Sequence, residues 1–195
     1  MTDLFHAAAH LLRPLRDRLL VLIATAAVVL ADETKLKVQE PKKTRTAWMW
    51  TFLGRLMSGA EEVELVAYRF SPSRSGETPS RVLGATTGAL VVDAYTGYNA
   101  VCAPEGRERA SCWAHCRRKF FEALPSAPEA QQAIDIIAEL YAVEHEALDL
   151  RIVRQPAHRA LRQRKGPPIL ERLRRWLEEQ QPQHVPKSPL GKAIR

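Results

Sequence analysis

The sequence predicts an α/β protein in which a mixed β-sheet is followed by a helical unit. After an N-terminal helix, strand-type segments follow one another until the pattern changes near residues 125 to 128, and only helix-type periodicity follows. The chain has 195 residues, of which 46% are hydrophobic and 26% charged. This composition is typical of a folded chain with one good core and room for a second small unit.

The N-terminal part of this pattern is one helix followed by three strands. Residues 3–25 carry leucines and alanines at helical spacing, and Pro14 is expected to kink or divide that helix. "AVVLADET" predicts a short buried strand that ends at Asp32. "AWMWTFLG" and "EVELVAYRF" alternate as strands do, and Ser58-Gly59 predicts a hairpin loop between them.

Two further strands and then helices are predicted for the rest of the chain. "SPSRSGETPSRVLG" indicates a polar loop with one helical turn, "GALVVD" a strand buried on both faces, and "RERASCW" another strand. Helices are predicted at "AHCRRKFFEAL", at "EAQQAIDIIAELYAVEHEALDL" and at "PPILERLRRWLEEQ". In the second of these, Ile134, Ile137, Tyr141 and Leu148 form the expected apolar side; in the third, Pro168 is expected near the first turn.

The charge of the chain favours an anionic partner. The formal net charge is +7, which favours nucleic acid first and an anionic membrane second. The three cysteines are too few for a disulfide framework and indicate a reducing compartment, so a cytoplasmic location is expected. The apolar stretch 19–31 is shorter than a membrane span, and Asp3 and Asp17 argue against a signal peptide.

Two aspartates follow apolar strands in the same way. Asp32 and Asp93 each lie at the expected C-terminal end of a strand, where two carboxylates can converge. Such a pair repels itself unless it shares a proton or a cation, and hard carboxylate oxygens suit Mg²⁺ or Mn²⁺. The alternative is that each aspartate caps a turn or a helix, and spacing does not separate the two.

The segment "CWAHCRRK" offers two further hypotheses. Cys112, His115 and Cys116 suggest zinc, but no second ligand pair accompanies them, so small buried cysteines and a core histidine are favoured. The basic run that follows either contacts phosphates or forms a solvated helix face. Its members are Arg117, Arg118 and Lys119.

Five of these segments together resemble one known family. "ADET", "DAYTGYN", "CWAHCRRKFFEAL", "AELYAVEHEA" and "PKSPLGKAI" occur in the order seen in transposases of the insertion-sequence-66 type, from about residue 28 to 194. This family belongs to the DDE group of transposases. The resemblance implies a ribonuclease-H-like fold with a helical insertion. It divides the chain into an N-terminal helical segment (1–26), an incomplete catalytic core (27–125) and a helical insertion with a basic tail (126–195).

The resemblance also implies a chemistry. Asp32 and Asp93 match the first two catalytic carboxylates, and Cys112 and His115 match a Cys-x-x-His pattern near the active site. Two Mg²⁺ or Mn²⁺ ions, expected only if a third carboxylate is supplied, would promote cleavage at the transposon end and attack of the freed 3′-hydroxyl on target DNA. The partner is therefore DNA rather than a membrane, contacted in part by Arg117, Arg118 and Lys119, and a homo-oligomer is left open.

The chain departs from the family pattern in one respect. The third acid is a Glu in an "Asp-Asn-Asn-x-x-Glu-Arg" motif, which does not occur here, so a truncated and inactive transposase is expected. Three alternatives remain. One is a DNA-binding fragment that regulates transposition, another a nuclease that recruits Glu33 as its third acid, and the last a remnant that folds poorly.

Overall fold

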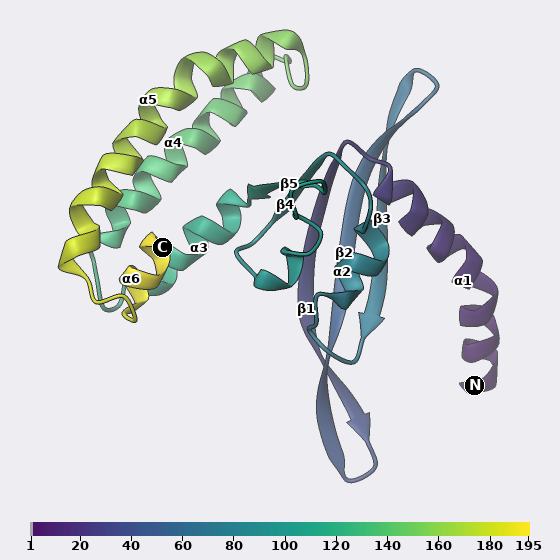
Figure 1. Ribbon diagram of the computed structural model, residues 1–195. Helices are drawn as coiled ribbons and strands as arrows, with labels where there is room; N and C mark the ends of the chain where they lie inside the picture. The colour runs from purple at the N-terminus through teal and green to yellow at the C-terminus, as the bar shows by residue number, and fades with distance from the viewer. Residues whose placement is uncertain (1) are drawn as a thin grey trace. The chain divides into compact units, whose positions relative to one another are not determined.

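The computed structural model describes residues 2–195, which form two compact units (Figure 1). The first is Met1–Cys112 and the second Trp113–Arg195. Each unit has its own buried cluster or clusters of apolar side chains. The division into 1–26, 27–125 and 126–195 assigned a functional role to each segment, and it stays a prediction.

The first unit is built on a five-stranded mixed sheet in the order β3-β2-β1-β4-β5. Strands β1, β2 and β3 are antiparallel neighbours, whereas β4 pairs in parallel with β1 and β5 in parallel with β4. The mixed α/β sheet predicted from the sequence is therefore confirmed, and it is compatible with a ribonuclease-H-like fold. The strands are β1 (Val28–Glu40), β2 (Lys43–Ser58), β3 (Glu61–Ser71), β4 (Ala89–Val92) and β5 (Glu108–Ser111).

The prediction that the first strand ends at Asp32 was wrong. β1 continues to Glu40, and Asp32 pairs with Thr51 in the middle of a long hairpin with β2. The segment after Asp32 alternates charged residues with half-buried Leu36 and Val38, which is the pattern of a strand with one solvated face. Only Lys42, with φ of 63°, and its neighbour Pro41 form the turn.

Helices of the first unit pack on one face of this sheet. In α1 (Thr2–Ala24), Leu20, Ile23 and Ala24 are buried with Trp50 and Phe52 of β2 in one cluster. Gly54 of β2 lets the end of α1 come close, because a Cβ atom there would lie 3.3 Å from the Cα of Ile23. Pro14 lies inside α1 and does not divide it. The outer part of α1 leaves apolar side chains exposed, namely Leu4, Phe5, Leu11, Leu12 and Leu15.

The segments around β4 hold the short parallel strands in place. α2 (Glu77–Leu83) ends at Gly84 as expected, and the short helix η1 (Thr96–Tyr98) follows β4. Gly88 has φ of 108°, which L-residues rarely adopt, and brings the chain onto the carbonyl of Ala27. β4 is a strand as predicted, but only one of its faces is buried and the other is half-buried, rather than both being buried.

A buried arginine ties α1 to the parallel strands. Arg107, just before β5, is 1% exposed. Its guanidinium donates to the carbonyls of Ala24 (2.7 Å), Ala26 (3.1 Å) and Ala89 (3.1 Å) and to Oγ1 of Thr86 (2.9 Å). Burial lowers the pKa of Arg107. The cation therefore donates to the carbonyl of Ala24 at the end of α1 and to that of Ala26 just beyond it, and joins both to Ala89 of β4.

The second unit is helical throughout the part that the structure describes. It comprises α3 (Trp113–Ala123), α4 (Ala130–Asp149), α5 (Pro156–Gln180), η2 (Gln181–Gln183) and α6 (Pro189–Ile194). α4 and α5 lie side by side (Figure 1). α6 lies in the tail, for which no helix was predicted; Ser188 caps it by accepting the N–H of Gly191 at 3.0 Å, and Pro189 occupies its first turn.

Two features of the long helices differ from expectation. α5 begins at Pro156, so Pro167 and Pro168 lie inside it rather than in its first turn. On α4, Ile134 and Ile137 are buried as predicted, but Tyr141 and Leu148 are 36% and 58% exposed. The buried stripe of α4 shifts along its length, because its C-terminal half contacts α5 through Val143 and Ala147 instead.

Candidate functional site

The two candidate aspartates lie at the same level of neighbouring parallel strands. The last paired residues of β1 and β4 are Leu30 and Val91, and Asp32 and Asp93 each come two residues later. Parallel neighbours lie about 4.8 Å apart, and residues two apart share a face of the sheet. The register therefore brings Asp32 and Asp93 to neighbouring positions, just past the C-terminal end of the segment in which β1 and β4 pair. Asp32 still lies within its strand, whereas Asp93 lies just beyond its own.

Cys112 occupies the corresponding position on the third parallel strand. Val92 pairs with Ser111, and the N–H of Cys112 donates to the carbonyl of Val92 at 3.0 Å. Cys112 thus follows β5 as Asp93 follows β4. His115 lies in the first turn of α3, in the second unit, and its place near the carboxylates stays a prediction.

The loop after β4 is fixed by its own hydrogen bonds. The N–H of Tyr95 donates to Oδ1 of Asp93 at 2.9 Å, which is the turn-forming contact that aspartate often makes. Arg109 of β5 donates from Nη2 to the carbonyls of Asp93 (3.0 Å) and Tyr95 (2.5 Å), and from Nη1 to Oδ1 of Asn99 (2.8 Å). The carboxylate of Asp93 therefore leaves the strand in a defined direction.

The segment after β4 is bonded to a buried acid, Glu33, for which sequence analysis had suggested only a role as a third catalytic acid. The side chain of Glu33 is 1% exposed and lies on the opposite face of β1 from exposed Asp32. Oε2 of Glu33 accepts the hydroxyl of Tyr98 at 2.7 Å, and Oε1 accepts Nε and Nη2 of Arg74 at 2.8 and 2.5 Å. These contacts speak against Glu33 as a third metal-binding acid.

The cation of Arg74 is held on several sides. Its guanidinium lies 3.9 Å from the ring centre of Tyr95 and 4.9 Å from that of Trp48. Burial disfavours the charged guanidinium, but the hydrogen bonds and charge of Glu33 outweigh burial and raise the pKa of Arg74. Tyr95 and Tyr98 lie in the "DAYTGYN" segment, which drew attention to Asp93 but gave these tyrosines no role, and Arg74 lies in a polar loop without a recognisable motif.

Tyr98 provides a prediction about alkaline stability. Burial raises its pKa well above the ordinary value of 10.0, and the hydrogen bond to Glu33 raises it further. Since the folded state keeps the phenol proton that the unfolded state loses above pH 10, stability should fall as pH rises past 10. Between pH 8 and pH 11 the free energy of unfolding should fall by about 1.4 kcal/mol less in Tyr98→Phe than in the wild-type chain. Urea unfolding at each pH measures this difference. An unchanged pH profile in the variant would contradict this.

The basic run of the sequence is exposed on α3. Arg117, Arg118 and Lys119 all lie at the surface. Glu122 partly balances them, at 3.9 Å from Arg118 and 3.3 Å from Lys119. The run is therefore available to an anionic partner, with one acid competing for two of its three charges.

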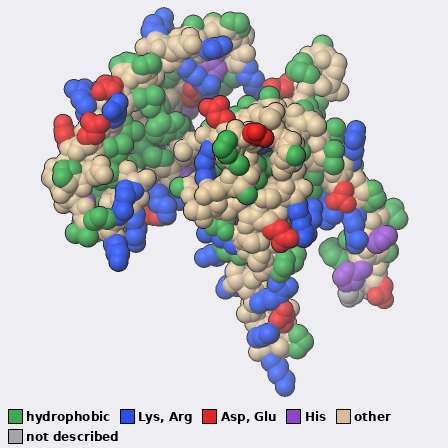
Figure 2. All heavy atoms as spheres, viewed as in Figure 1, with side chains coloured by type: hydrophobic (Ala, Val, Ile, Leu, Met, Phe, Trp, Pro, Cys, Tyr) green, Lys and Arg blue, Asp and Glu red, His purple; other side chains and the backbone are tan. Residues whose placement is uncertain are grey.

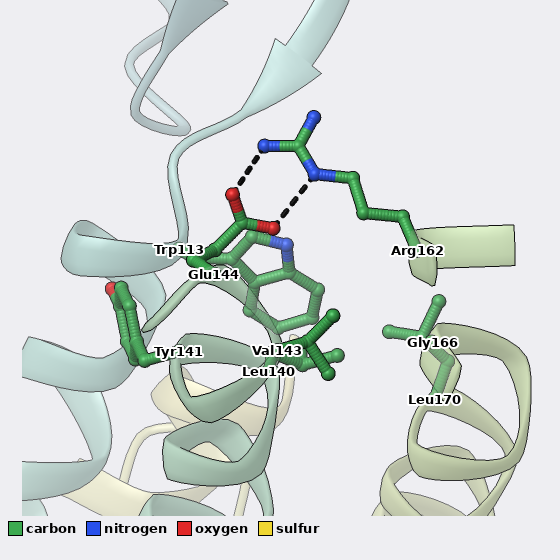
Figure 3. A pocket seen from close by; sticks show the side chains of 8 residues that line it. All are labelled: Trp113, Leu140, Tyr141, Val143, Glu144, Arg162, Gly166 and Leu170. Carbon is green, nitrogen blue, oxygen red and sulfur yellow. Dashed lines mark hydrogen bonds and ion pairs between the residues drawn. The ribbon is translucent and has the colours of Figure 1, made fainter. Parts of the chain in front are cut away.

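A separate cavity of about 500 Å³ lies between α4 and α5 of the second unit (Figure 3). Its wall includes Trp113, Tyr141 and Leu170, and Arg162 donates from Nε to Glu144 at 2.7 Å. The hydrogen bonds of Arg162 hold the pKa of Glu144 below its usual range. Neither aspartate of the candidate site lines this cavity.

Residues 2–195 hold neither a cluster of metal-binding side chains nor a helix that could span a membrane. In residues 2–195, no three side chains of His, Cys, Asp or Glu are grouped as a metal site would require. In the same range, every helix is too short or too polar to cross a lipid bilayer.

Comparison with known proteins identifies the family. The family model described as "Transposase IS66 family" matches residues 1–195. The chain is 33% identical over 196 residues to the uncharacterized protein y4jD and 32% identical over 197 residues to the uncharacterized protein y4qI, both of Sinorhizobium fredii (strain NBRC 101917 / NGR234). Each match covers 94% of this chain but only 38% and 36% of the relatives' own lengths. Because that family model matches residues 1–195, the chain belongs to the IS66 transposase family.

Proposed function

We propose that this chain carries two of the acidic residues with which a transposase cuts DNA at the ends of its element and joins them to target DNA. The observation that carries the proposal is the common level of Asp32 and Asp93 on adjacent parallel strands, in a member of a transposase family. We expect the reaction to take place on DNA in the cytoplasm, in keeping with the reducing compartment that the three cysteines indicate.

The chemistry of the two side chains fits a divalent cation. Carboxylate oxygens are the ligands that Mg²⁺ and Mn²⁺ prefer, and two of them on neighbouring strands can bind one ion between them. A cation bound there would offset the negative charge that develops on the phosphodiester during cleavage. Asp32 and Asp93 would hold it, with Oδ1 of Asp93 oriented by the N–H of Tyr95.

The pair supplies only part of the ligand set that this chemistry uses. Glu33, the nearest further acid along β1, is buried and bonded to Arg74 and Tyr98. Because no third acid joins the pair within residues 2–195, we expect the 195-residue chain alone neither to cut nor to join element ends, even with Mn²⁺. A strand-transfer assay on labelled element ends checks this expectation, and reproducible joining by the purified chain would refute it.

The metal half of the proposal is tested by binding rather than by activity. We expect Mn²⁺ to bind weakly to the wild-type chain, and Asp93→Asn or Asp32→Asn to weaken that binding at least about tenfold, because each removes one charged ligand. Electron paramagnetic resonance of free Mn²⁺ measures the affinity. Asp135→Asn, which removes an exposed carboxylate of α4, is the control and should leave the affinity unchanged. Equal Mn²⁺ binding by all variants would place the ion elsewhere.

A second candidate function is DNA binding without catalysis, as in a regulator of transposition. The observation that favours it is the distribution of charge: residues 113–195 hold 15 of the 29 Lys and Arg but only 10 of the 22 Asp and Glu. Figure 2 shows many of these cations at the surface of the helices. Such binding should depend steeply on salt, because each phosphate contact releases counterions.

A further inference from the structure

We propose that Glu33 is a positioning residue: its buried carboxylate holds the segment of β1 that carries Asp32 and the loop that carries Asp93 in one fixed arrangement. The inference rests on the proposed function, since it concerns the geometry of the same pair. It assigns Glu33 no contact with metal or DNA.

The position of Glu33 in the chain couples it to Asp32. It follows Asp32 directly on β1, and successive strand residues point to opposite faces. Any movement of the backbone at Glu33 therefore moves Asp32. A carboxylate that is 1% exposed must be hydrogen-bonded to remain charged in the core, so the bonds it makes are strongly constrained.

Glu33 is also bonded to Tyr98. This side chain is fully buried and comes from η1, five residues after Asp93. Its ring packs edge to face on Trp50 at 5.7 Å and on Tyr95 at 6.1 Å between ring centres. With the 2.7 Å hydrogen bond to Glu33, Tyr98 fixes the far end of the loop that begins at Asp93.

Arg74 closes the network between Glu33 and Tyr95. Its guanidinium binds Glu33 and covers the ring of Tyr95, whose hydroxyl donates back to the carbonyl of Arg74. The N–H of the same Tyr95 donates to Asp93. A continuous chain of contacts thus runs from Glu33 through Arg74 and Tyr95 to the carboxylate of Asp93.

The choice of a charged residue at position 33 supports a positioning role over a purely stabilising one. Replacing buried ionic groups with apolar residues of similar size is often neutral or stabilising, so the core alone does not require an acid here. An apolar side chain would not supply directional bonds to two loops at once. The network lies where two carboxylates of like charge must be kept close, and that is where such bonds are useful.

The first test measures the local order of the Asp93 loop without any metal. Amide hydrogen exchange of Tyr95, followed by NMR, reports its hydrogen bond to Asp93. We expect exchange about tenfold faster in Tyr98→Phe and in Glu33→Gln, relative to the amides of β4 in the same sample, since the loop opens locally more often. Tyr98→Phe keeps the ring in the core, so it separates loss of the bond from loss of packing.

A matched control is available in the same sheet. Arg55 and Glu64 form an exposed Arg–Glu pair between β2 and β3 at 2.6 Å, away from the loop. Arg55→Met should leave the Tyr95 exchange ratio unchanged. If Tyr98→Phe and Glu33→Gln also leave it unchanged, Glu33 does not position Asp93, and the inference is overturned.

The second test measures the consequence for the cation, with Mn²⁺ as the probe. Residues that orient metal ligands typically change metal affinity by 10–100-fold when substituted, so we expect Tyr98→Phe to weaken Mn²⁺ binding by at least about tenfold. Arg74→Lys keeps the charge but loses the planar contacts of the guanidinium. Its affinity for Mn²⁺ should therefore be almost as low as that of Arg74→Met.

The two tests separate the inference from the function on which it rests. If the wild-type chain binds no Mn²⁺ but Tyr95 exchange responds to Tyr98→Phe, the metal proposal fails while the positioning of Asp93 is supported. If Mn²⁺ binds through Asp93, and Tyr98→Phe changes neither the Tyr95 amide exchange nor the Mn²⁺ affinity, the function is supported and the inference fails.

Discussion

Replacing Arg107 with methionine is expected to lower the free energy of unfolding of the first unit by about 3 kcal/mol. The guanidinium donates to the carbonyls of Ala24, Ala26 and Ala89, all within the core region where α1 meets the sheet. Each buried acceptor that loses its donor costs roughly 1–3 kcal/mol, and relief from burying an unpaired cation offsets part of the total. Urea unfolding, with hydrogen exchange of the sheet amides to monitor the first unit separately, measures the loss.

Two further variants make this result interpretable. Arg107→Lys keeps the charge but presents a single ammonium, so it should lose an intermediate amount. Arg81→Met breaks an exposed pair with Glu77 within α2 and should cost roughly 0.5 kcal/mol or less. If Arg107→Met were as stable as Arg81→Met, the carbonyls around Arg107 would have to find other donors, and its role as the link between α1 and β4 would be wrong.

The sequence predicted β2 and β3 because each alternates with a period of two that tertiary packing did not override. The hairpin at Gly59 follows from a turn residue that adopts positive φ between two alternating segments. The end of β1 was misplaced because an aspartate after an apolar run was taken as a boundary. In the structure, pairing with β2 continues past Asp32 to Glu40.

The candidate site could be predicted only in part. Asp32 and Asp93 stood out because each follows an apolar run, and the parallel register then brings them to one level. Arg74, Arg109 and Tyr98 act through contacts between segments 14 to 65 residues apart, which no local pattern encodes. Arg107 also escaped prediction, since a buried arginine bonded to carbonyls looks in sequence like any surface cation.

Helix boundaries in the second unit show the same limit. Pro168 was expected in a first turn because proline usually breaks a helix interior. α5 nevertheless begins at Pro156, with buried His158 and Leu161 in the turns before the prolines. The packing of these side chains against α4 holds a helix that local preference alone would have started later.

Neutralising the basic run of α3 is expected to weaken DNA binding by about 100-fold at 50 mM salt. The change replaces Arg117, Arg118 and Lys119 with glutamine, which keeps polar side chains of helical preference. Each lost phosphate contact also reduces the slope of log affinity against log salt by about 0.9, so the slope should become shallower by up to about 2.7. Fluorescence anisotropy with a labelled duplex at several salt concentrations measures both quantities.

A second basic cluster of the same charge provides the control for this experiment. Lys42, Lys43 and Arg45 lie at the tip of the β1–β2 hairpin, where Figure 2 shows exposed cations. Glu40 contacts Lys43 at 3.5 Å and Arg45 at 2.5 Å, much as Glu122 contacts two members of the α3 run. Changing these three residues to glutamine removes the same net charge with the same kind of acidic neighbour left behind.

The comparison decides between contact and mere attraction. If net charge alone drives binding, the two triple variants should lose equal affinity and change the salt slope equally, because both lower the charge from +7 by three. If α3 contacts phosphates directly, the α3 variant alone should show the shallower slope, since counterions are released only where cations meet the backbone. Equal effects would therefore refute a DNA contact at Arg117, Arg118 and Lys119 while leaving general attraction to DNA intact.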